Sequence, residues 1–234
     1  MDKELGKRLL CGLLLIAVIS LLVCRGGRAV RTLASAGAER TLVIDAGHGG
    51  FDGGAIGATG TTEQDINLSI AQRVQSLAGF FGVRTVMTRE SGDALGYNEG
   101  KSVRDNKITD IKAREQIVRD TPNPVFISIH LNKFGDPQYH GAQVFYSPNH
   151  AGSRALAELL QNDLIAGADP DNHRQAKQAE STIYLMKKLD CPAVIVECGF
   201  LSNPAEEARL ADAEYHKKLA VCITSGYLQY ESGV

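Results

Sequence analysis

Apolar residues follow a strand-like pattern in five places along the chain. Each run is short, rich in β-branched residues and almost continuously apolar, which is typical of strands buried on both faces of a sheet. The runs are residues 41–45 (TLVID), 83–88 (VRTVMT), 125–130 (VFISIH), 142–146 (AQVFY) and 193–198 (AVIVEC). The pattern predicts a core built on a β-sheet.

Helical stripes alternate with these strands. Apolar residues three and four positions apart predict amphipathic helices through Ile66, Ile70, Val74 and Leu77, through Leu156, Leu159, Leu160 and Leu164, and through Leu219, Ile223 and Tyr227. Thr61 and Thr62 are suited to cap the first helix. The polar residues 90–112 predict a long loop that runs into a further helix. This alternation predicts a single α/β domain, with a mostly parallel or mixed twisted sheet and helices on both faces.

The amino terminus breaks this pattern. Residues 9–24 carry no charge. As a helix they span about 24 Å, somewhat less than the roughly 30 Å of bilayer hydrocarbon. The long side chains of flanking basic residues make up the difference by reaching the lipid headgroups. We predict a cytoplasmic tail and signal anchor at residues 1–24, a linker at 25–40 and a globular domain at 41–234. Basic residues flank the apolar run on both sides, so they do not set its orientation. The small residues 34–36 (ASA) leave cleavage of the segment open.

Charge and cysteine content exclude several classes of protein. The 234 residues suit one domain, and the net charge of -2 comes without a basic stripe, which argues against a nucleic-acid partner. Outside the apolar segment, Cys191, Cys198 and Cys222 form no CxxC motif. They predict buried free thiols rather than disulfides or a thiolate zinc site.

Chemically active residues gather where the strands end. His48 follows the first strand in DAGHGG, His130 closes VFISIH, and Glu197 closes AVIVE. Ligands of open α/β sheets collect beyond the carboxyl ends of the strands. Glu63, in GTTEQDINL, opens the helix after the glycine loop, where a glutamate also suits the helix dipole. Two histidines and two glutamates match a catalytic zinc site, in which His₂Glu binds the metal and the other glutamate acts as base. Manganese or iron would accept similar donors less well.

Four motifs, in this order and at this spacing, give a specific resemblance. DAGHGG, GTTEQD, ISIHLN and VIVECGFLSNP resemble the zinc-dependent N-acetylmuramoyl-L-alanine amidases (type 3) of bacterial cell walls. The similarity runs from Thr41 to the carboxyl terminus. This sequence has Ala46 where the family usually has proline and Gln64 where it often has lysine, and neither change removes a ligand.

The resemblance implies a fold, a site and a reaction. It implies a six-stranded α/β domain, one Zn²⁺ per chain held by His48, Glu63 and His130, and Glu197 as the catalytic carboxylate. The substrate would be peptidoglycan, cleaved at the amide between the lactyl group of muramic acid and L-alanine. Residues 133–140 are too few for the inserted helix that blocks the zinc in some relatives.

A finer resemblance concerns the whole chain. The short tail, single anchor and bare catalytic domain, with residues 179–204 (AESTIYLMKKLDCPAVIVECGFLSNP), resemble the sporulation amidases of endospore formers. This implies a role in spore-cortex maturation, where a peptidoglycan deacetylase acts next and muramic-δ-lactam forms. It also implies a membrane-anchored protein with an extracytoplasmic catalytic domain between the forespore membranes. The anchor or an accessory protein would target the domain to the wall, and an accessory protein would also be a candidate activator.

Three further residues are candidates for substrate binding. Arg89 would meet a peptide carboxylate, with a structural ion pair as the alternative. Asn132 lies two residues beyond His130 and therefore faces the same side, with structural amide bonding as the alternative. The same reasoning applies to Gln143. The remaining histidines are interpreted as solvated: His140, His150, His173 and His216.

Other functions fit parts of the sequence. Cys198 with His130 would suit a cysteine peptidase, although Cys198 should face away from Glu197. Glu63 and Glu197 would suit a glycosidase, which leaves both strand-end histidines unexplained. A partner-dependent, metal-bearing wall-binding protein would use the same residues without catalysis.

Overall fold

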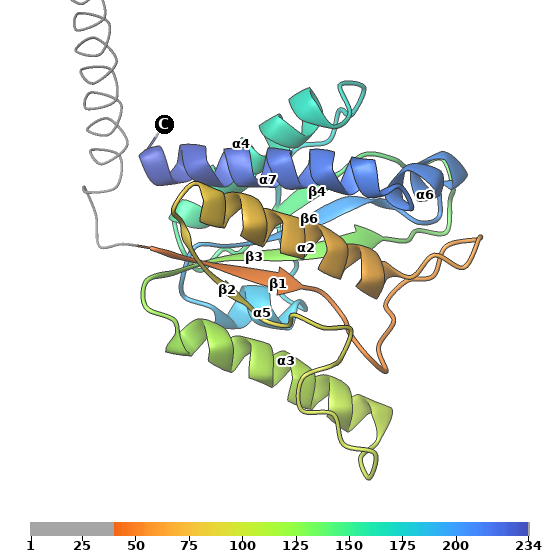
Figure 1. The fold of residues 1–234 in the computed structure, drawn as a ribbon, viewed down its shortest axis with the longest axis vertical. Coiled ribbons are helices and arrows are strands. Elements are labelled where there is room, and N and C mark those ends of the chain that lie inside the picture. Colours follow the sequence, from red (N-terminus) through yellow and green to blue (C-terminus); the bar gives the residue numbers. More distant parts are fainter. Residues whose placement is uncertain (1–39, 234) are drawn as a thin grey trace, which may run out of the picture. The chain divides into compact units, whose positions relative to one another are not determined.

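A six-stranded sheet has the strand order β2-β1-β3-β6-β4-β5 (Figure 1). Four strands are mutually parallel: β1 (Thr41–Ala46), β2 (Arg84–Met87), β3 (Pro124–Asn132) and β6 (Ala193–Phe200). The strand β4 (Gln143–Tyr146) runs antiparallel to β6 and parallel to β5 (Lys177–Gln178). The predicted mixed sheet of six strands is confirmed.

The computed structural model describes residues 40–233. The predicted tail and anchor (1–24) and the linker (25–40) lie outside the described residues, apart from Arg40. Within the described part, none of the helices has both the length and the apolar character that crossing a bilayer requires.

Helices cover both faces of the sheet (Figure 1). One face carries α2 (Glu63–Phe80), α4 (Gly152–Gly167) and α7 (Ala213–Ser232). The other carries α3 (Val103–Asp120) and α5 (Tyr184–Lys188), while α6 (Pro204–Leu210) follows β6. Neighbouring residues of β1 show the period of two: Leu42 and Ile44 pack into the first core and Val43 into the second, all fully buried.

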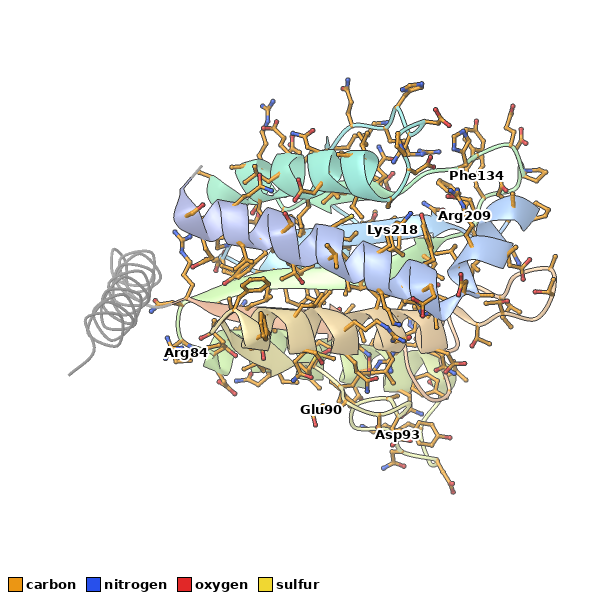
Figure 2. The ribbon with its side chains drawn as sticks, turned by 45° about the horizontal axis from the view of Figure 1, so that its top comes forward. Arg84, Glu90, Asp93, Phe134, Arg209 and Lys218 are labelled. Carbon is orange, nitrogen blue, oxygen red and sulfur yellow. The ribbon has the colours of Figure 1, made fainter. Side chains whose placement is uncertain are left out.

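The parallel strands point toward one end of the domain. Arg84, at the start of β2, and Phe134, just beyond the end of β3, lie at opposite ends in Figure 2. Strand-end residues of β1, β3 and β6 therefore meet at the end marked by Phe134.

The predicted strands and helical stripes are all found. Thr62 is the N-cap residue of α2, as predicted, and Ser102 caps α3 after the polar loop by accepting from the Asp105 amide. The elements missed are short: β5 has two residues, both exposed, and α5 and α6 have five and seven. Elements of this length contain too few residues to show a hydrophobic period.

His216 is not solvated as predicted. It lies in α7, is 6% exposed, and its two ring nitrogens contact the Ser69 hydroxyl at 2.8 Å and the Leu210 carbonyl at 2.6 Å. Burial lowers the pKa of His216. Because charged residues surround His216 in the sequence (AEYHKK), the local pattern indicated an exposed position. The ring instead joins α7 to α2 and α6.

A buried ion pair ties β1 to α3. Asp45 and Arg114 are 1% and 2% exposed, and Asp45 Oδ1 lies 2.6 Å from Arg114 Nη1. The hydroxyls of Thr88 and Ser128 donate to the same carboxylate at 2.6 and 2.5 Å. Burial alone would raise the pKa of Asp45, but Arg114 and these two hydroxyls lower it from 3.8 to about 2.

Arg114 extends this network to the loop after β1. Its Nη1 donates to the Ala46 carbonyl at 2.8 Å and its Nη2 to the His48 carbonyl at 2.6 Å. Asp110, one helical turn away, accepts from Nε at 2.7 Å. One guanidinium therefore fixes the backbone of the loop that presents His48.

We expect Asp45→Asn to lower the free energy of unfolding by about 3 kcal/mol, because the buried Arg114 loses its principal counter-charge. The measurement is urea unfolding with a chelator present, and Asp190→Asn, an exposed carboxylate, is the control. Since the folded pKa of Asp45 lies below its unfolded value, its contribution in the unaltered protein is complete above pH about 4 and is lost as the pH falls through about 2. A loss below about 1 kcal/mol would contradict the assignment.

Candidate metal centre

Three side chains from separate elements converge at the carboxyl end of the sheet. His48 lies in the loop after β1, Glu63 opens α2, and His130 lies in β3. His48 Nε2 is 3.2 Å and His130 Nδ1 is 3.0 Å from the same oxygen, Glu63 Oε1. One ligand atom from each residue lies within 4.8 Å of the other two, so the group is able to hold one metal ion.

Two glycines leave the space that the ligands occupy. A Cβ at position 47 would lie 2.3 to 2.6 Å from ring atoms of His130. At Gly54, which has φ of +71°, a Cβ would lie 2.6 Å from Glu63 Oε2 and 2.8 Å from His48 Cδ2. The glycine-rich stretch therefore allows the backbone to approach the ligand side chains.

His48 is fixed at both its backbone and its ring. Its φ of 62° lies in the left-handed region, which is uncommon for a residue other than glycine. Its Nδ1 is 3.1 Å from Asp52 Oδ2, and the other Asp52 oxygen is 3.0 Å from Lys107 Nζ. Because Nδ1 of His48 faces Asp52, the ring presents its other nitrogen, Nε2, to Glu63.

The charge of this site is set by the same contacts. Burial would lower the pKa of His48, but Asp52 and Glu63 raise it to about 9. Burial would raise the pKa of Glu63, yet His130 and His48 hold it well below its usual range. Glu63 is thus ionised, and a metal ion that binds Nε2 of His48 displaces a proton from the imidazolium.

Glu63 is held at both oxygens by donors outside the histidines. Oε1 accepts from the Leu131 amide at 3.0 Å and from the Asn67 side chain at 3.3 Å, and Oε2 accepts from the Ala55 amide at 2.8 Å. The side chain is buried, with 3% of the residue exposed. These bonds fix the orientation that a ligand carboxylate needs.

Glu197 lies beside His130 on the neighbouring strand. The parallel pairing of β3 with β6 aligns His130 with Glu197, so both side chains lie on one face of the sheet. Glu197 Oε2 is buried and accepts no hydrogen bond from any residue between 40 and 233. Burial raises the pKa of Glu197, although His130 lowers it. A buried carboxyl oxygen without a partner is suited to proton transfer.

The donor set fits zinc. Two imidazole nitrogens and one carboxylate are the ligands of many catalytic zinc sites, which keep a further position open for water or substrate. Asp52 supplies the outer carboxylate that commonly orients a zinc-bound histidine. Glu197 remains outside this group of three, with an oxygen available for chemistry.

Arg89 was predicted to contact the substrate, but it binds backbone carbonyls of the protein itself. It is 4% exposed, and its guanidinium donates at 2.8 to 3.0 Å to the carbonyls of Ala46, Gly47, Gln64 and Ser91. Its charge therefore braces the loop around His48 and the start of α2 rather than facing solvent.

Gln143 and Asn132 lie next to the site, and their contacts with substrate stay predictions. Gln143 pairs with Glu197 across the antiparallel β4–β6 ladder, which places both side chains on one face. Gln143 is 5% exposed, and its amide nitrogen donates to the Gln175 carbonyl at 2.9 Å. Asn132 ends β3 and is partly exposed on the side of His130.

Two residues that shape the site were missed from the sequence. Asp52 stands four positions after His48, and that spacing was the available signal. Arg114 stands in a polar helix beside other charges (DIKAREQ), and nothing local distinguishes it from a solvated arginine.

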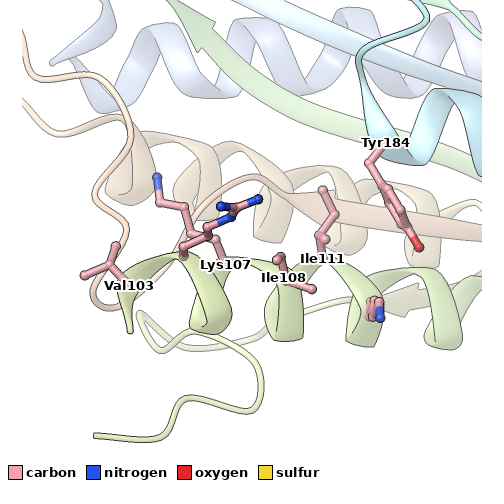
Figure 3. A pocket seen from close by; sticks show the side chains of 7 residues that line it. Val103, Lys107, Ile108, Ile111 and Tyr184 are labelled. Carbon is pink, nitrogen blue, oxygen red and sulfur yellow. The ribbon is translucent and has the colours of Figure 1, made fainter. Parts of the chain in front are cut away.

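One hollow adjoins the metal-binding group, and a second, larger hollow adjoins the first. The smaller, of about 170 Å³, is lined by His48 and His130 together with Asp52. The larger, of about 720 Å³, follows α3 and is lined by apolar side chains and basic groups, with Tyr184 across from the helix (Figure 3). Lys107 and Ile111 line both hollows.

The three thiols among the described residues are free, as predicted, although Cys191 is only partly buried. Cys198 points to the face of the sheet opposite to that of Glu197. It is fully buried and packs in the core on the α2, α4 and α7 side of the sheet. Burial raises the pKa of the Cys198 thiol strongly. These facts argue against the cysteine peptidase.

The comparison with known families decides between the functions that remain, which are an amidase, a glycosidase and a wall-binding protein. Residues 42–229 match the family described as N-acetylmuramoyl-L-alanine amidase. The chain belongs to this family. The amidase identity predicted from the four motifs is confirmed, and the protein is an N-acetylmuramoyl-L-alanine amidase that acts on peptidoglycan.

Individual amidases show how far the likeness extends. The germination-specific N-acetylmuramoyl-L-alanine amidase of Bacillus subtilis is 35% identical over 191 residues, covering 82% of this chain and 79% of the relative. The CwlD amidase from Clostridioides difficile, solved in complex with the GerS lipoprotein, is 38% identical with a TM-score of 0.79, covering 83% of this chain and 99% of that one. The amidase AmiC2 of Nostoc punctiforme is 29% identical with a TM-score of 0.70, covering 83% and 98%.

We expect Asp52→Asn to weaken zinc binding by the amidase about 10- to 100-fold, because the outer carboxylate no longer fixes the His48 ring. The measurement is zinc affinity by competition with a chelating dye. Asp65→Asn is the control, since Asp65 is an exposed carboxylate in the first turn of α2. Equal affinities for the two variants would show that Asp52 does not orient the ligand.

Proposed function

We propose that this amidase uses one Zn²⁺, held by His48, Glu63 and His130, to cleave the amide between the lactyl group of N-acetylmuramic acid and L-alanine. The convergence of these three ligands supports the metal. The family membership supports the substrate. The observation that carries the mechanism is the buried, unpartnered Oε2 of Glu197 beside them.

Zinc in this group would lower the pKa of a water molecule to about 7 and polarise the amide carbonyl. Glu197 then acts as the proton carrier. Its unpartnered oxygen accepts the proton of the attacking water and returns it to the departing nitrogen of L-alanine. Because burial raises the pKa of Glu197, this carboxyl releases the proton less readily to solvent and is better matched to transfer near neutral pH.

The other charged residues keep this geometry fixed. Asp52 and the left-handed backbone of His48 orient the imidazole, and two backbone amides orient the Glu63 carboxylate. Glu63 is thereby committed to the metal, which leaves a glycosidase without its second acid.

A role in the spore cortex rests on the relatives. One is named for germination and another is the CwlD amidase, solved with the GerS lipoprotein. We infer that this amidase strips peptides from muramic acids, that a peptidoglycan deacetylase consumes the product, and that muramic-δ-lactam forms. An accessory protein would supply targeting or activation.

The cellular site belongs to the same proposal. Residues 1–24 would anchor the chain in the membrane through their uncharged run. The catalytic domain would then face the space between the forespore membranes, where cortex is made.

We expect Glu197→Gln in the full-length protein to lower kcat about 10³-fold while zinc binding is retained, because the amide neither accepts nor delivers the proton. Activity is measured on purified peptidoglycan after chelation and after adding zinc, counting new alanine amino groups and new reducing ends. Cys198→Ser is the matched neighbour and should keep its activity.

Three outcomes would overturn parts of the proposal. Full activity of Glu197→Gln would remove the proton carrier, and loss of activity in Cys198→Ser alone would restore the cysteine mechanism. New reducing ends in place of alanine amino groups would point to glycoside cleavage.

A further inference from the structure

An arginine next to Glu197 and Gln143 has no acidic partner within residues 40–233. Arg174 lies in the loop between α4 and β5, is partly exposed, and forms no ion pair with any residue from 40 to 233. The nearby carboxylate Asp169 is 3.6 Å from Arg209 and 3.9 Å from His140 instead. Arg174 is therefore a positive charge whose counter-charge the described residues do not supply.

The guanidinium of Arg174 is nevertheless held firmly. Nη1 donates to Gln143 Oε1 at 3.0 Å and Nε to the His140 carbonyl at 2.7 Å. Its central carbon lies 4.5 Å from the centre of the Phe200 ring and 5.9 Å from that of Tyr139, within the range of cation–π attraction.

The loop itself is anchored at its base. The Asn172 side chain is 2% exposed, donates to the Ala142 carbonyl at 2.8 Å and accepts from the Arg174 amide at 3.0 Å. Gln143 returns a bond to the Gln175 carbonyl. These contacts order Arg174 before a ligand arrives and so reduce the entropy lost on binding.

The other arginines of the site show what is unusual here. Arg89 donates to four backbone carbonyls, and Arg114 is paired with Asp45 and Asp110. In contrast, the structure assigns no partner among the described residues to Nη2 of Arg174. That edge of the guanidinium retains donors for a carboxylate.

The direction of the substrate follows from Glu197. Because Glu197 protonates the departing amine, the peptide side of the scissile amide must lie on the Glu197 side of the metal ligands. On that face the next side chain across the sheet is Gln143, directly opposite Glu197, and Gln143 bonds Arg174. The peptide therefore passes toward Arg174.

The reach of the peptide agrees with this placement. The residue after L-alanine in the stem is a D-glutamate linked through its side chain, so its α-carboxylate is unblocked. Five covalent bonds, about 6 Å, separate the L-alanine nitrogen from that carboxylate carbon. Cross-strand neighbours such as Glu197 and Gln143 have Cβ atoms about 5 Å apart, and the guanidinium lies one hydrogen bond beyond Gln143.

We propose that Arg174, positioned by Gln143 beside Glu197, binds the free α-carboxylate of the second stem residue and makes the enzyme selective for stems that carry it. This assignment rests on the amidase function proposed above. It gives Gln143 the role of a positioning residue and predicts discrimination against stems in which that carboxylate is a carboxamide.

The test uses the full-length protein loaded with zinc and two soluble muramoyl tripeptides, L-Ala-γ-D-Glu-L-Lys and its analogue with an α-carboxamide on the second residue. We expect the unaltered enzyme to favour the carboxylate in kcat/KM on the order of tenfold, as for one charge-assisted pair. Arg174→Gln should abolish that preference, mainly through KM, and Arg174→Lys should keep part of it. Arg154→Gln, an exposed arginine of α4, should keep it all.

The outcomes separate the two proposals. Release of the peptide from both muramoyl tripeptides at equal kcat/KM by the unaltered enzyme would refute the role of Arg174 and leave the amidase intact. An equal fall on both substrates in Arg174→Gln, with a lower unfolding temperature, would show that Arg174 only braces its loop. New reducing ends from peptidoglycan, with no peptide released from either muramoyl tripeptide, would refute the proposed bond itself and the role of Arg174 with it.

Discussion

The buried pairing of Asp45 with Arg114 is the interaction on which the rest of the site depends. Asp45, next to the last residue of β1, accepts hydrogen bonds from the hydroxyls of Thr88, just beyond β2, and Ser128, in β3. Arg114 reaches from α3 to the carbonyls of Ala46 and His48. A charge pair this deep is stabilising only when every remaining donor and acceptor is satisfied, and here the ion pair, hydroxyls and carbonyls satisfy them. The arrangement therefore couples the packing of α3 to the position of His48, the first of the candidate metal ligands.

Much of the fold could be predicted from the sequence, because long strands and helices repeat their apolar pattern often enough to be recognised. His48, Glu63, His130 and Glu197 were found because each stands at the end of a recognisable element. The roles of Arg89, Arg114 and His216 were not predictable, since their partners are backbone carbonyls, a buried carboxylate or distant side chains. Local sequence shows that a residue is charged, and only the tertiary structure shows what neutralises it.

The site divides its charged groups by the partner each one has. Glu63 accepts hydrogen bonds at both oxygens and is kept ionised. Glu197, on the strand next to that of His130, has one oxygen that accepts no hydrogen bond within the described part of the chain. Two carboxyl groups close in space are thus given opposite proton affinities by their surroundings. The arginines differ in the same way. Arg89 and Arg114 use their guanidinium donors on carbonyls and carboxylates within the domain, while Arg174 keeps donors for a further partner.

The reversed direction of β4 has a consequence for how such a protein diversifies. Because β4 runs against β6, it begins rather than ends at the edge where the ligands lie, and residues 133–142 and 168–176 both reach that edge. None of the three ligands lies in these two loops. If Arg174 binds the stem as proposed, insertions or replacements there would alter which stems are accepted while the candidate metal centre, built on parallel strands, stays unchanged. Recognition and chemistry would then occupy separate, independently variable parts of a single domain.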